Sequence, residues 1–321
     1  MSGSRITTGT DNVILGAEAM RFSSGSAGNN TAVGTNAMRN LSTGTYNIGI
    51  GSSTANGGGI TGDNNVLLGY QAASNLSSGA HNIMLGNQAG FVTSSGAYNV
   101  LLGYNAGGDI TTGTNNVAIG RSALDAVTTG GSIVAIGYNA GGAYTGTNNF
   151  VAIGSNCFSG SGGMVESVGI GPDVGSSMAS GQWNVLIGSA AGAGNTGGEN
   201  NVYVGQRVSG DPNAVGTGSN NVGIGHKALY NSTSANQNTA VGKEAGNSLT
   251  TGVNNTIIGY DADASSATVS NEITIGNASV SRFRIPGAGI DSTSAALSGT
   301  TPSVDVGARD TYTLTTSGNT T

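Results

Sequence analysis

The chain has 321 residues, of which 58 are glycine and only 8% are charged, and its formal net charge is −6 at pH 7. An acidic chain with few Lys and Arg residues lacks the clustered cations that nucleic-acid binding needs, so we expect no nucleic-acid partner. No run of about 18 apolar residues is present, so we expect no membrane insertion. Although the chain is rich in Gly, Ser, Thr and Asn, its apolar residues recur at fixed intervals, which argues against a disordered chain.

A five-residue motif, Asn-Φ-x-Φ-Gly with Φ apolar, recurs almost from one end of the chain to the other. Its final glycine occurs 16 times, and 12 of the 15 intervals between successive motif glycines have the same length. A period this short predicts a stack in which each coil contacts only its neighbours. We therefore expect an all-β fold, a parallel β-solenoid or β-roll of about 16 coils with a 17-residue period. The motif glycines are Gly16, Gly34, Gly51, Gly69, Gly86, Gly103, Gly120, Gly137, Gly154, Gly171, Gly188, Gly205, Gly225, Gly242, Gly259 and Gly276.

The three residues before each motif glycine are expected to form a short strand, as at residues 66–68. Alternate strand residues share a face, so we expect the two flanking aliphatic residues, here Val66 and Leu68, to point into their own coil. The middle residue, here Leu67, would then point outward, and it is apolar in many coils. Strands that are apolar on both faces are covered on both faces, so the pattern predicts another subunit against the outer one.

Each motif glycine is followed by a position that is usually Ala, often by a second glycine, and then by an aliphatic residue and a Ser/Thr-Ser/Thr-Gly turn. Glycines at a fixed phase supply the positive φ angles that tight corners require. A coil of this length is therefore expected to hold two short strands and two corners.

Cys157, the only cysteine, occupies the Ala position, where we expect a small buried thiol rather than a nucleophile or a ligand.

The asparagine that opens the motif is expected to form a hydrogen-bonded ladder, because equal positions of stacked coils lie about 4.8 Å apart. This structural role is predicted for Asn65, Asn82, Asn99 and Asn116. Sixteen coils at that spacing would make a rod on the order of 75 Å long. The ladder is expected to be interrupted where other residues occupy the position and where one interval is longer than the rest. These places are Ile133, Phe150, Ser167, Glu272 and the segment around Pro212.

Aromatic residues recur beside the motif and are candidates for contact with a glycan. Tyr70, Tyr104 and Tyr138 each follow a motif glycine, in alternate coils about 10 Å apart. Trp183 stands just before a motif asparagine, at the phase that Tyr46, His81 and Tyr98 occupy in other coils. Such rings could stack on the sugars of a host glycan, or they could pack against a neighbouring chain.

Candidate catalytic residues are few, and we predict that the protein is not an enzyme. Glu244 and Asp261 have the same phase in adjacent coils, which would place them about 5 Å apart, a separation that suits a retaining glycosidase. Two observations favour ordinary surface acids: Glu18 and Asp173 have the same phase without such a partner, and Lys243 adjoins Glu244. No Ser/His/Asp arrangement, calcium repeat or phosphate-binding loop is present, so no metal or cofactor is expected.

The period is lost after Gly276, and the segment Arg282–Ile290 with its proline and glycines indicates a boundary. We expect a solenoid domain over residues 1–281, followed by a junction, a linker and the start of a C-terminal β segment over residues 282–321. Alternating residues predict strands at 304–306 and 311–315.

The repeat Asn-Φ-x-Φ-Gly-x-x-Ala with Ser/Thr-Gly turns resembles two related groups of proteins. One is the head of trimeric autotransporter adhesins, a parallel β-roll with three chains side by side. The other, which is closer, is the repeat region of phage tail fibres, which often precedes a self-cleaving intramolecular chaperone. Runs such as Gly113–Gly120 and Gly252–Gly259 are typical of those fibres, and residues 283–289 resemble the junction ahead of the chaperone. This chain departs from the adhesins in its longer period and in lacking a stalk or membrane anchor, and from the complete fibres in lacking the chaperone.

The resemblance implies a side-by-side homotrimer that forms a structural and adhesive segment of a phage tail fibre. Its partners would be further copies of itself, other tail proteins and a receptor on the host surface, expected to be a glycan, and its location would be the virion. No secretory leader is visible at Met1, which favours a particle assembled inside the host cell. The alternative is the head of a trimeric adhesin on a bacterial cell surface. An ice-binding solenoid is a third interpretation, but threonine doublets appear in only some coils.

Overall fold

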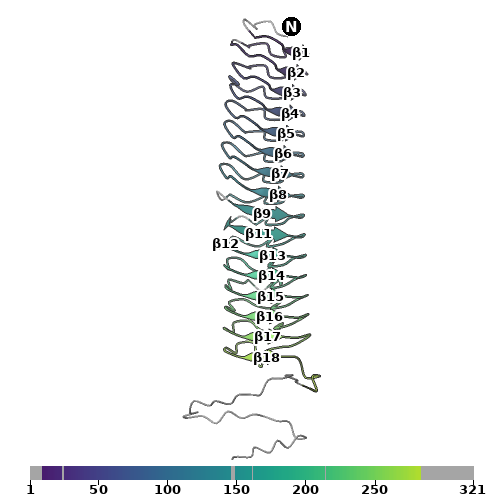
Figure 1. Ribbon diagram of the computed structural model, residues 1–321, viewed down its shortest axis with the longest axis vertical. Coiled ribbons are helices and arrows are strands. Elements are labelled where there is room, and N and C mark those ends of the chain that lie inside the picture. Colours follow the sequence, from purple (N-terminus) through teal and green to yellow (C-terminus); the bar gives the residue numbers. More distant parts are fainter. Residues whose placement is uncertain (1–8, 24, 146–148, 161, 214, 283–321) are drawn as a thin grey trace, which may run out of the picture. The chain divides into compact units, whose positions relative to one another are not determined.

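The computed structural model describes residues 9–23, 25–145, 149–160, 162–213 and 215–282. The chain divides into two compact units, Met1–Val280 and Ser281–Thr321. The first unit contains the repeats and is a stack of coils (Figure 1). The junction, linker and strands expected beyond residue 282 lie outside the described residues.

One parallel sheet runs along the whole stack, with one short strand from each coil. Its 16 strands follow the chain order, and the described residues contain no helix. A separate pair of strands, β10 (Gly163–Val165) and β12 (Ser180–Gln182), forms a second small sheet. The main sheet consists of β1 (Val13–Leu15), β2 (Thr31–Val33), β3 (Ile48–Ile50), β4 (Val66–Leu68), β5 (Ile83–Leu85), β6 (Val100–Leu102), β7 (Val117–Ile119), β8 (Val134–Ile136), β9 (Phe150–Ile153), β11 (Ser167–Ile170), β13 (Val185–Ile187), β14 (Val202–Val204), β15 (Val222–Ile224), β16 (Thr239–Val241), β17 (Thr256–Ile258) and β18 (Ile273–Ile275).

Equivalent residues of successive coils stack directly on one another. Strand β4 pairs with β5 so that Leu67 lies opposite Met84, and every other pair of neighbours in the main sheet keeps the same phase. The predicted all-β parallel solenoid with a 17-residue period is therefore confirmed. Because the register is constant, each position of the repeat becomes a column that runs along the stack.

The predicted orientation of the strands is wrong. The middle residue of the strand points into the coil, where Leu67, Met84 and Leu101 are at most 1% exposed. The flanking aliphatic residues point outward, and none of them is buried. The physical reason is the motif asparagine: Asn99 lies two residues before Leu101, so the two side chains share a face, and the asparagine is fully buried.

The core is filled by two columns of complementary size. We call the residue four positions after each motif glycine the corner residue. In several coils with a large middle strand residue the corner residue is glycine: a Cβ on Gly107 would lie only 2.8 Å from Leu101 Cδ2. Where the middle residue is glycine, a large side chain of the preceding coil can fill the space: a Cβ on Gly169 would lie 2.7 Å from the ring of Phe158, the corner residue one coil earlier. This exchange of volume, within a coil and between neighbouring coils, keeps the core close-packed.

The second strand expected in each coil is absent from most of the described coils. Apart from β10 and β12, the part of the described coils between one strand of the main sheet and the next forms only isolated bridges, such as Leu41–Ile60. Backbone hydrogen bonds still join successive coils there, as from Ser77 N to Ser94 O and from Ser94 N to Thr111 O, both 2.9 Å. Left-handed residues such as Asn105 (φ 52°) and Gly107 (φ 58°) turn the chain repeatedly, which leaves no extended run long enough for a strand.

The motif glycine is required for two reasons, as Gly103 illustrates. Its φ angle is 140°, which side chains of L-residues rarely allow, and a Cβ there would lie 2.5 Å from the carbonyl oxygen of Gly120 in the next coil. The strand therefore ends at a point where two backbones approach too closely for any other residue.

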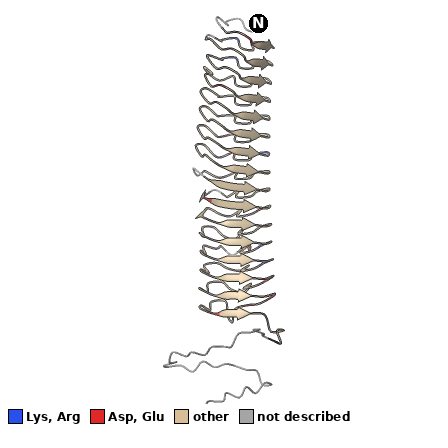
Figure 2. Ribbon diagram, in the orientation of Figure 1, with Lys and Arg blue, Asp and Glu red and all other residues tan. Residues whose placement is uncertain are grey.

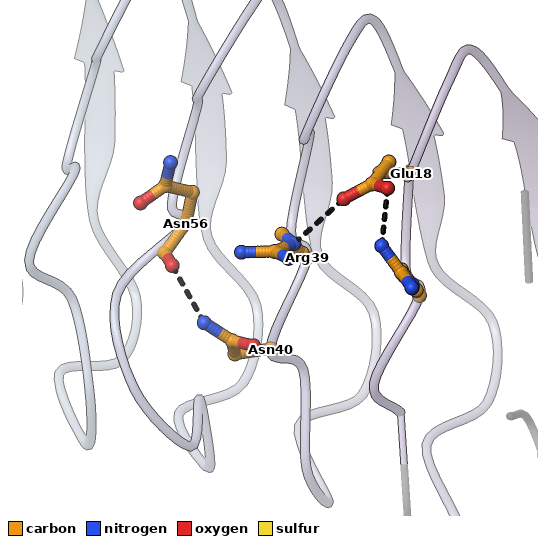
Figure 3. Close-up of polar contacts among 5 residues, drawn as sticks. Glu18, Arg39, Asn40 and Asn56 are labelled. Carbon is orange, nitrogen blue, oxygen red and sulfur yellow. Dashed lines mark hydrogen bonds and ion pairs between the residues drawn. The ribbon is translucent and has the colours of Figure 1, made fainter.

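Polar contacts also join the first three coils. Glu18 forms ion pairs with Arg21 and with Arg39, whose Nε lies 3.1 Å from Glu18 Oε2, and the Asn40 side chain donates to the carbonyl oxygen of Asn56 at 2.9 Å (Figure 3). Because the charged side chains are about a third exposed, they align neighbouring coils rather than stabilise them strongly.

Candidate interaction surface

The outer side of the main sheet is a strip of aliphatic side chains that are half-buried in most coils and exposed in the others. We call it the aliphatic face and define it as the residues one and three positions before each motif glycine. All of its members are Val, Ile or Leu except for Thr31, Thr239 and Thr256. It carries no charged residue, and charged positions are sparse along the described part of the ribbon (Figure 2). Exposure is highest at the two ends, with Leu15 66% and Ile273 73% exposed.

The aliphatic face is large for a surface left in water. At about 4.8 Å per coil and with two residues across, it is on the order of 70 Å long and 10 Å wide. The resulting area, on the order of 700 Å², exceeds the largest apolar patch of a typical monomer. It approaches the roughly 800 Å² that each partner buries in a standard protein interface.

Two further columns of mostly exposed side chains border the aliphatic face, one at each end of its strands. We call the residue five positions before each motif glycine the leading column and the residue directly after it the trailing column. In the coil of Gly103, the outward residues are Tyr98, Val100, Leu102 and Tyr104, of which the two tyrosines are 58% and 53% exposed. The complete outer face is thus four residues wide.

The three tyrosines predicted as glycan contacts lie together on the trailing column. Tyr70, Tyr104 and Tyr138 occupy alternate coils and are 46–53% exposed. The guanidinium of Arg121, in the coil between the last two, lies 4.6 Å from the ring centre of Tyr138. These side chains form one row along a single edge of the aliphatic face.

Trp183, the fourth predicted contact, lies on the opposite edge, in the leading column. It is 49% exposed, and its indole nitrogen donates to Glu166 Oε2 at 2.6 Å in the preceding coil. In the same column the rings of His81 and Tyr98 stack at 4.8 Å with an interplanar angle of 3°. The structure therefore brings the tyrosines together but separates them from Trp183 by the width of the aliphatic face.

Every residue of the leading column has a left-handed backbone. The φ angles lie between 53° and 62°, including 58° at Tyr98 and 56° at Trp183. Asparagine tolerates this conformation and occupies half of the 16 positions. For a bulky aromatic residue the same backbone is strained.

The motif asparagines form a buried ladder beneath this surface. Asn99 Nδ2 donates to Asn82 Oδ1 at 3.1 Å and to the carbonyl oxygen of Gly113 at 2.9 Å. The backbone N–H of Asn116 in turn donates to Asn99 Oδ1 at 3.0 Å. The same pattern includes Asn65, so the four asparagines assigned to the ladder lie in one hydrogen-bonded column.

The ladder changes at some of the expected places but not at all of them. Ile133 and Phe150 have no amide to contribute, although the N–H of Ile133 still donates to Asn116 Oδ1. No interruption occurs at the longest interval, where Asn221 N donates to Asn201 Oδ1 at 2.9 Å. That expectation is wrong because the added length bulges outward: Pro212 and Asn213 are exposed, and the coil closes beneath them.

The other candidate side chains are placed as ordinary structural or surface groups. Glu244 Oε1 lies 3.5 Å from Lys243 Nζ and 3.9 Å from His226 Nδ1. Cys157 is fully buried, and burial raises the pKa of its thiol to about 12. The described part of the chain contains no cluster of three or more His, Cys, Asp or Glu residues placed to hold a metal ion. Among the described residues, no helix has the length and hydropathy that crossing a membrane requires.

Comparisons with protein-family models, with curated proteins and with solved structures found no match to this chain.

The surface that sequence reasoning missed is the aliphatic face itself, which was assigned to the inside of the coil. A signal was present, since a motif asparagine that forms a ladder must be kept from water and shares its face with the middle strand residue.

Proposed function

We propose that this chain is a structural and adhesive segment of a phage tail fibre, in which three copies lie side by side and carry an attachment surface away from the virion. The observation that carries the proposal is the aliphatic face. A solenoid that buries one side of its strands internally and leaves a continuous aliphatic strip on the other side needs a partner for that side. A fibre built of identical chains supplies one.

The dimensions of the outer face suit three chains. Four residues across a strand direction span about 20 Å. Three such faces close into a triangle whose sides lie about 6 Å from the axis, close to half the roughly 10 Å spacing of packed sheets. One layer of Val, Ile and Leu side chains from each chain would therefore fill the centre.

The remaining surface suits attachment rather than catalysis. It is dominated by Ser, Thr, Asn and Gly, and it carries exposed aromatic rings that stack on sugars. Two partners fit these rings, a host glycan and a neighbouring chain. We propose that other tail proteins hold the ends of the rod, and that reach and adhesion are its actions.

The first test is the mass in solution, measured by light scattering over a range of protein concentrations. We expect a stable particle of three times 31.2 kDa. A variant with Leu102→Lys and Ile119→Lys places charges on the aliphatic face and should be monomeric. The matched control, Ser95→Lys with Thr112→Lys, changes exposed residues elsewhere on the same coils and should keep the wild-type mass.

A monomer at all concentrations would contradict the trimeric fibre.

Binding to host surface glycans is tested separately on an array, with Tyr70→Ala, Tyr104→Ala and Tyr138→Ala combined in one variant. Loss of glycan binding with the particle mass retained would assign the trailing tyrosines to adhesion.

A further inference from the structure

We propose that the leading column of each chain packs against the trailing column of the next, so that the chains run parallel and in register. In coils three to eight, this contact forms an aromatic seam between subunits. The inference rests on the proposed trimer but goes beyond it, because it names the residues at the boundary and the relative direction of the chains. It also assigns the trailing tyrosines to a second copy of this chain rather than to a glycan.

The geometry of the outer face provides the first argument. The two columns are continuous with the aliphatic face and border it on opposite sides in every coil. When parallel chains close around a common axis, the edges of neighbouring faces meet, and rotation brings the leading edge of one chain to the trailing edge of the next. The seam is therefore the continuation of the contact that covers the aliphatic face.

The two columns carry charges of opposite sign. The leading column carries two acids, Asp11 and Glu166, and no Lys or Arg. The trailing column carries Arg121 and Lys243 and no acid. An arrangement with like columns facing each other would gather charges of one sign along each seam, whereas leading against trailing mixes the two signs.

Backbone strain provides the third argument. Tyr46, His81, Tyr98 and Trp183 have left-handed φ angles of 56–59°, at positions where half of the coils use asparagine. Asparagine would be less strained there, and the exposed rings contribute little to the core of their own coil. Contact with a second chain gives these rings a buried surface that offsets the strain.

The distribution of the aromatic residues indicates the direction of the chains. In coils three to eight the leading column holds Tyr46, His81 and Tyr98, and the trailing column holds Tyr70, Tyr104 and Tyr138. Parallel chains in register bring these two groups together. Antiparallel chains would instead place both aromatic groups opposite coils nine to fourteen. The columns of those coils are mostly polar and hold two aromatic residues, Trp183 and His226.

The test is a crosslinking experiment on the full chain in a Cys157→Ala background. The variant Tyr98→Cys with Tyr104→Cys carries one thiol in each column of the same coil. With a short bis-maleimide at low protein concentration, we expect a covalent trimer on a denaturing gel. Either single cysteine variant should stay monomeric on that gel, because each thiol would face a column that has none.

The outcomes separate the two proposals. A particle of trimeric mass in which the double variant does not crosslink, or in which a single variant does, overturns the seam and leaves the trimer standing. A monomeric mass for the wild-type chain overturns both.

A second experiment distinguishes the seam from a glycan site. The variant Tyr46→Asn, His81→Asn, Tyr98→Asn replaces strained residues with the one most common at their position. When assembly is blocked by Leu102→Lys with Ile119→Lys, adding these three substitutions should leave the unfolding temperature of the monomer unchanged or raise it. Without that block, we expect the assembled particle to dissociate at a protein concentration at least about tenfold higher than wild type. The control Gln237→Asn lies outside the aromatic coils and should change neither. Unchanged assembly together with lost glycan binding would overturn the seam.

Discussion

In most coils one asparagine satisfies backbone groups that the stack would otherwise leave unpaired. The side chain of Asn99 accepts from the N–H of the next ladder residue and donates to a glycine carbonyl at the corner. The amide both donates and accepts, which no aliphatic side chain can do, so no aliphatic residue replaces it without loss. The motif asparagines are therefore the residues that close the hydrogen bonding of the core.

We predict that Asn99→Ala destabilises the solenoid by about 2–5 kcal/mol, because it leaves the N–H of Asn116 and the carbonyl of Gly113 buried without partners. Urea unfolding followed by circular dichroism measures the change. Replacement of the exposed Asn75 by Ala is the control and should shift the midpoint little. Equal effects of the two substitutions would show that the ladder contributes nothing.

Cys157 gives a prediction about pH. Burial raises the pKa of its thiol from 9.0 to about 12, so the folded state holds the proton more tightly than the unfolded state does. The stabilisation from this proton is complete below pH 9 and is lost as pH rises toward 12. We expect iodoacetamide to leave the folded protein unmodified at pH 8, and the denaturation midpoint to fall between pH 9 and 11.

The control for the alkaline effect is Cys157→Ala, which uses the residue most common at that position. Its midpoint should fall less over the same range, but it should still fall, because burial also raises the pKa of Tyr203 to about 12. Rapid alkylation of the wild-type thiol at pH 8 would contradict its burial.

At the scale of the element, core packing and tolerance of added length are properties of the whole coil rather than of its strand. The strands are short, whereas the corner column decides whether a large or a small residue fits in the middle of the strand. The outward bulge at Pro212 shows that a coil accepts extra length where the chain already faces solvent, since the ladder beneath it is unbroken. Loop length at such a place costs little free energy.

We therefore predict that deletion of Asp211–Asn213, which returns that coil to the length of its neighbours, leaves the melting temperature within about 2 °C of the wild-type value. Deletion of Ser94–Gly96 removes the same number of residues but takes away the carbonyl that accepts from Asn82. That variant should melt well below the wild type or fail to fold. Similar behaviour of the two deletions would mean that the position of added length is unimportant.

At the scale of the whole molecule, the solenoid unit leaves its most apolar surface outside. The core of each coil is thin and rich in alanine and glycine, so much of the burial available to this chain lies on the aliphatic face. Folding and assembly should then be linked, as in obligate oligomers.

Linkage gives a prediction: the melting temperature of the wild-type chain should rise with protein concentration. The monomeric variant Leu102→Lys with Ile119→Lys should melt at a lower temperature that does not depend on concentration. Differential scanning calorimetry over a hundredfold range of concentration makes the comparison. A wild-type melting temperature that is independent of concentration would contradict the proposed assembly.

The period, the parallel stacking and the column of motif asparagines were all predictable from the sequence alone. They repeat in one dimension, and a register that recurs at a nearly constant interval leaves little freedom in how neighbouring coils align. The direction in which each strand faces was not predictable from the alternation of Val66, Leu67 and Leu68, because both faces are apolar and a period of two does not say which one is inside. The tertiary structure decided it, since only one choice buries the amide of Asn65 within hydrogen-bonding distance of Asn47 and lets large and small residues exchange volume across the core. That choice placed the aliphatic pair outside and so created the surface on which the proposed assembly depends.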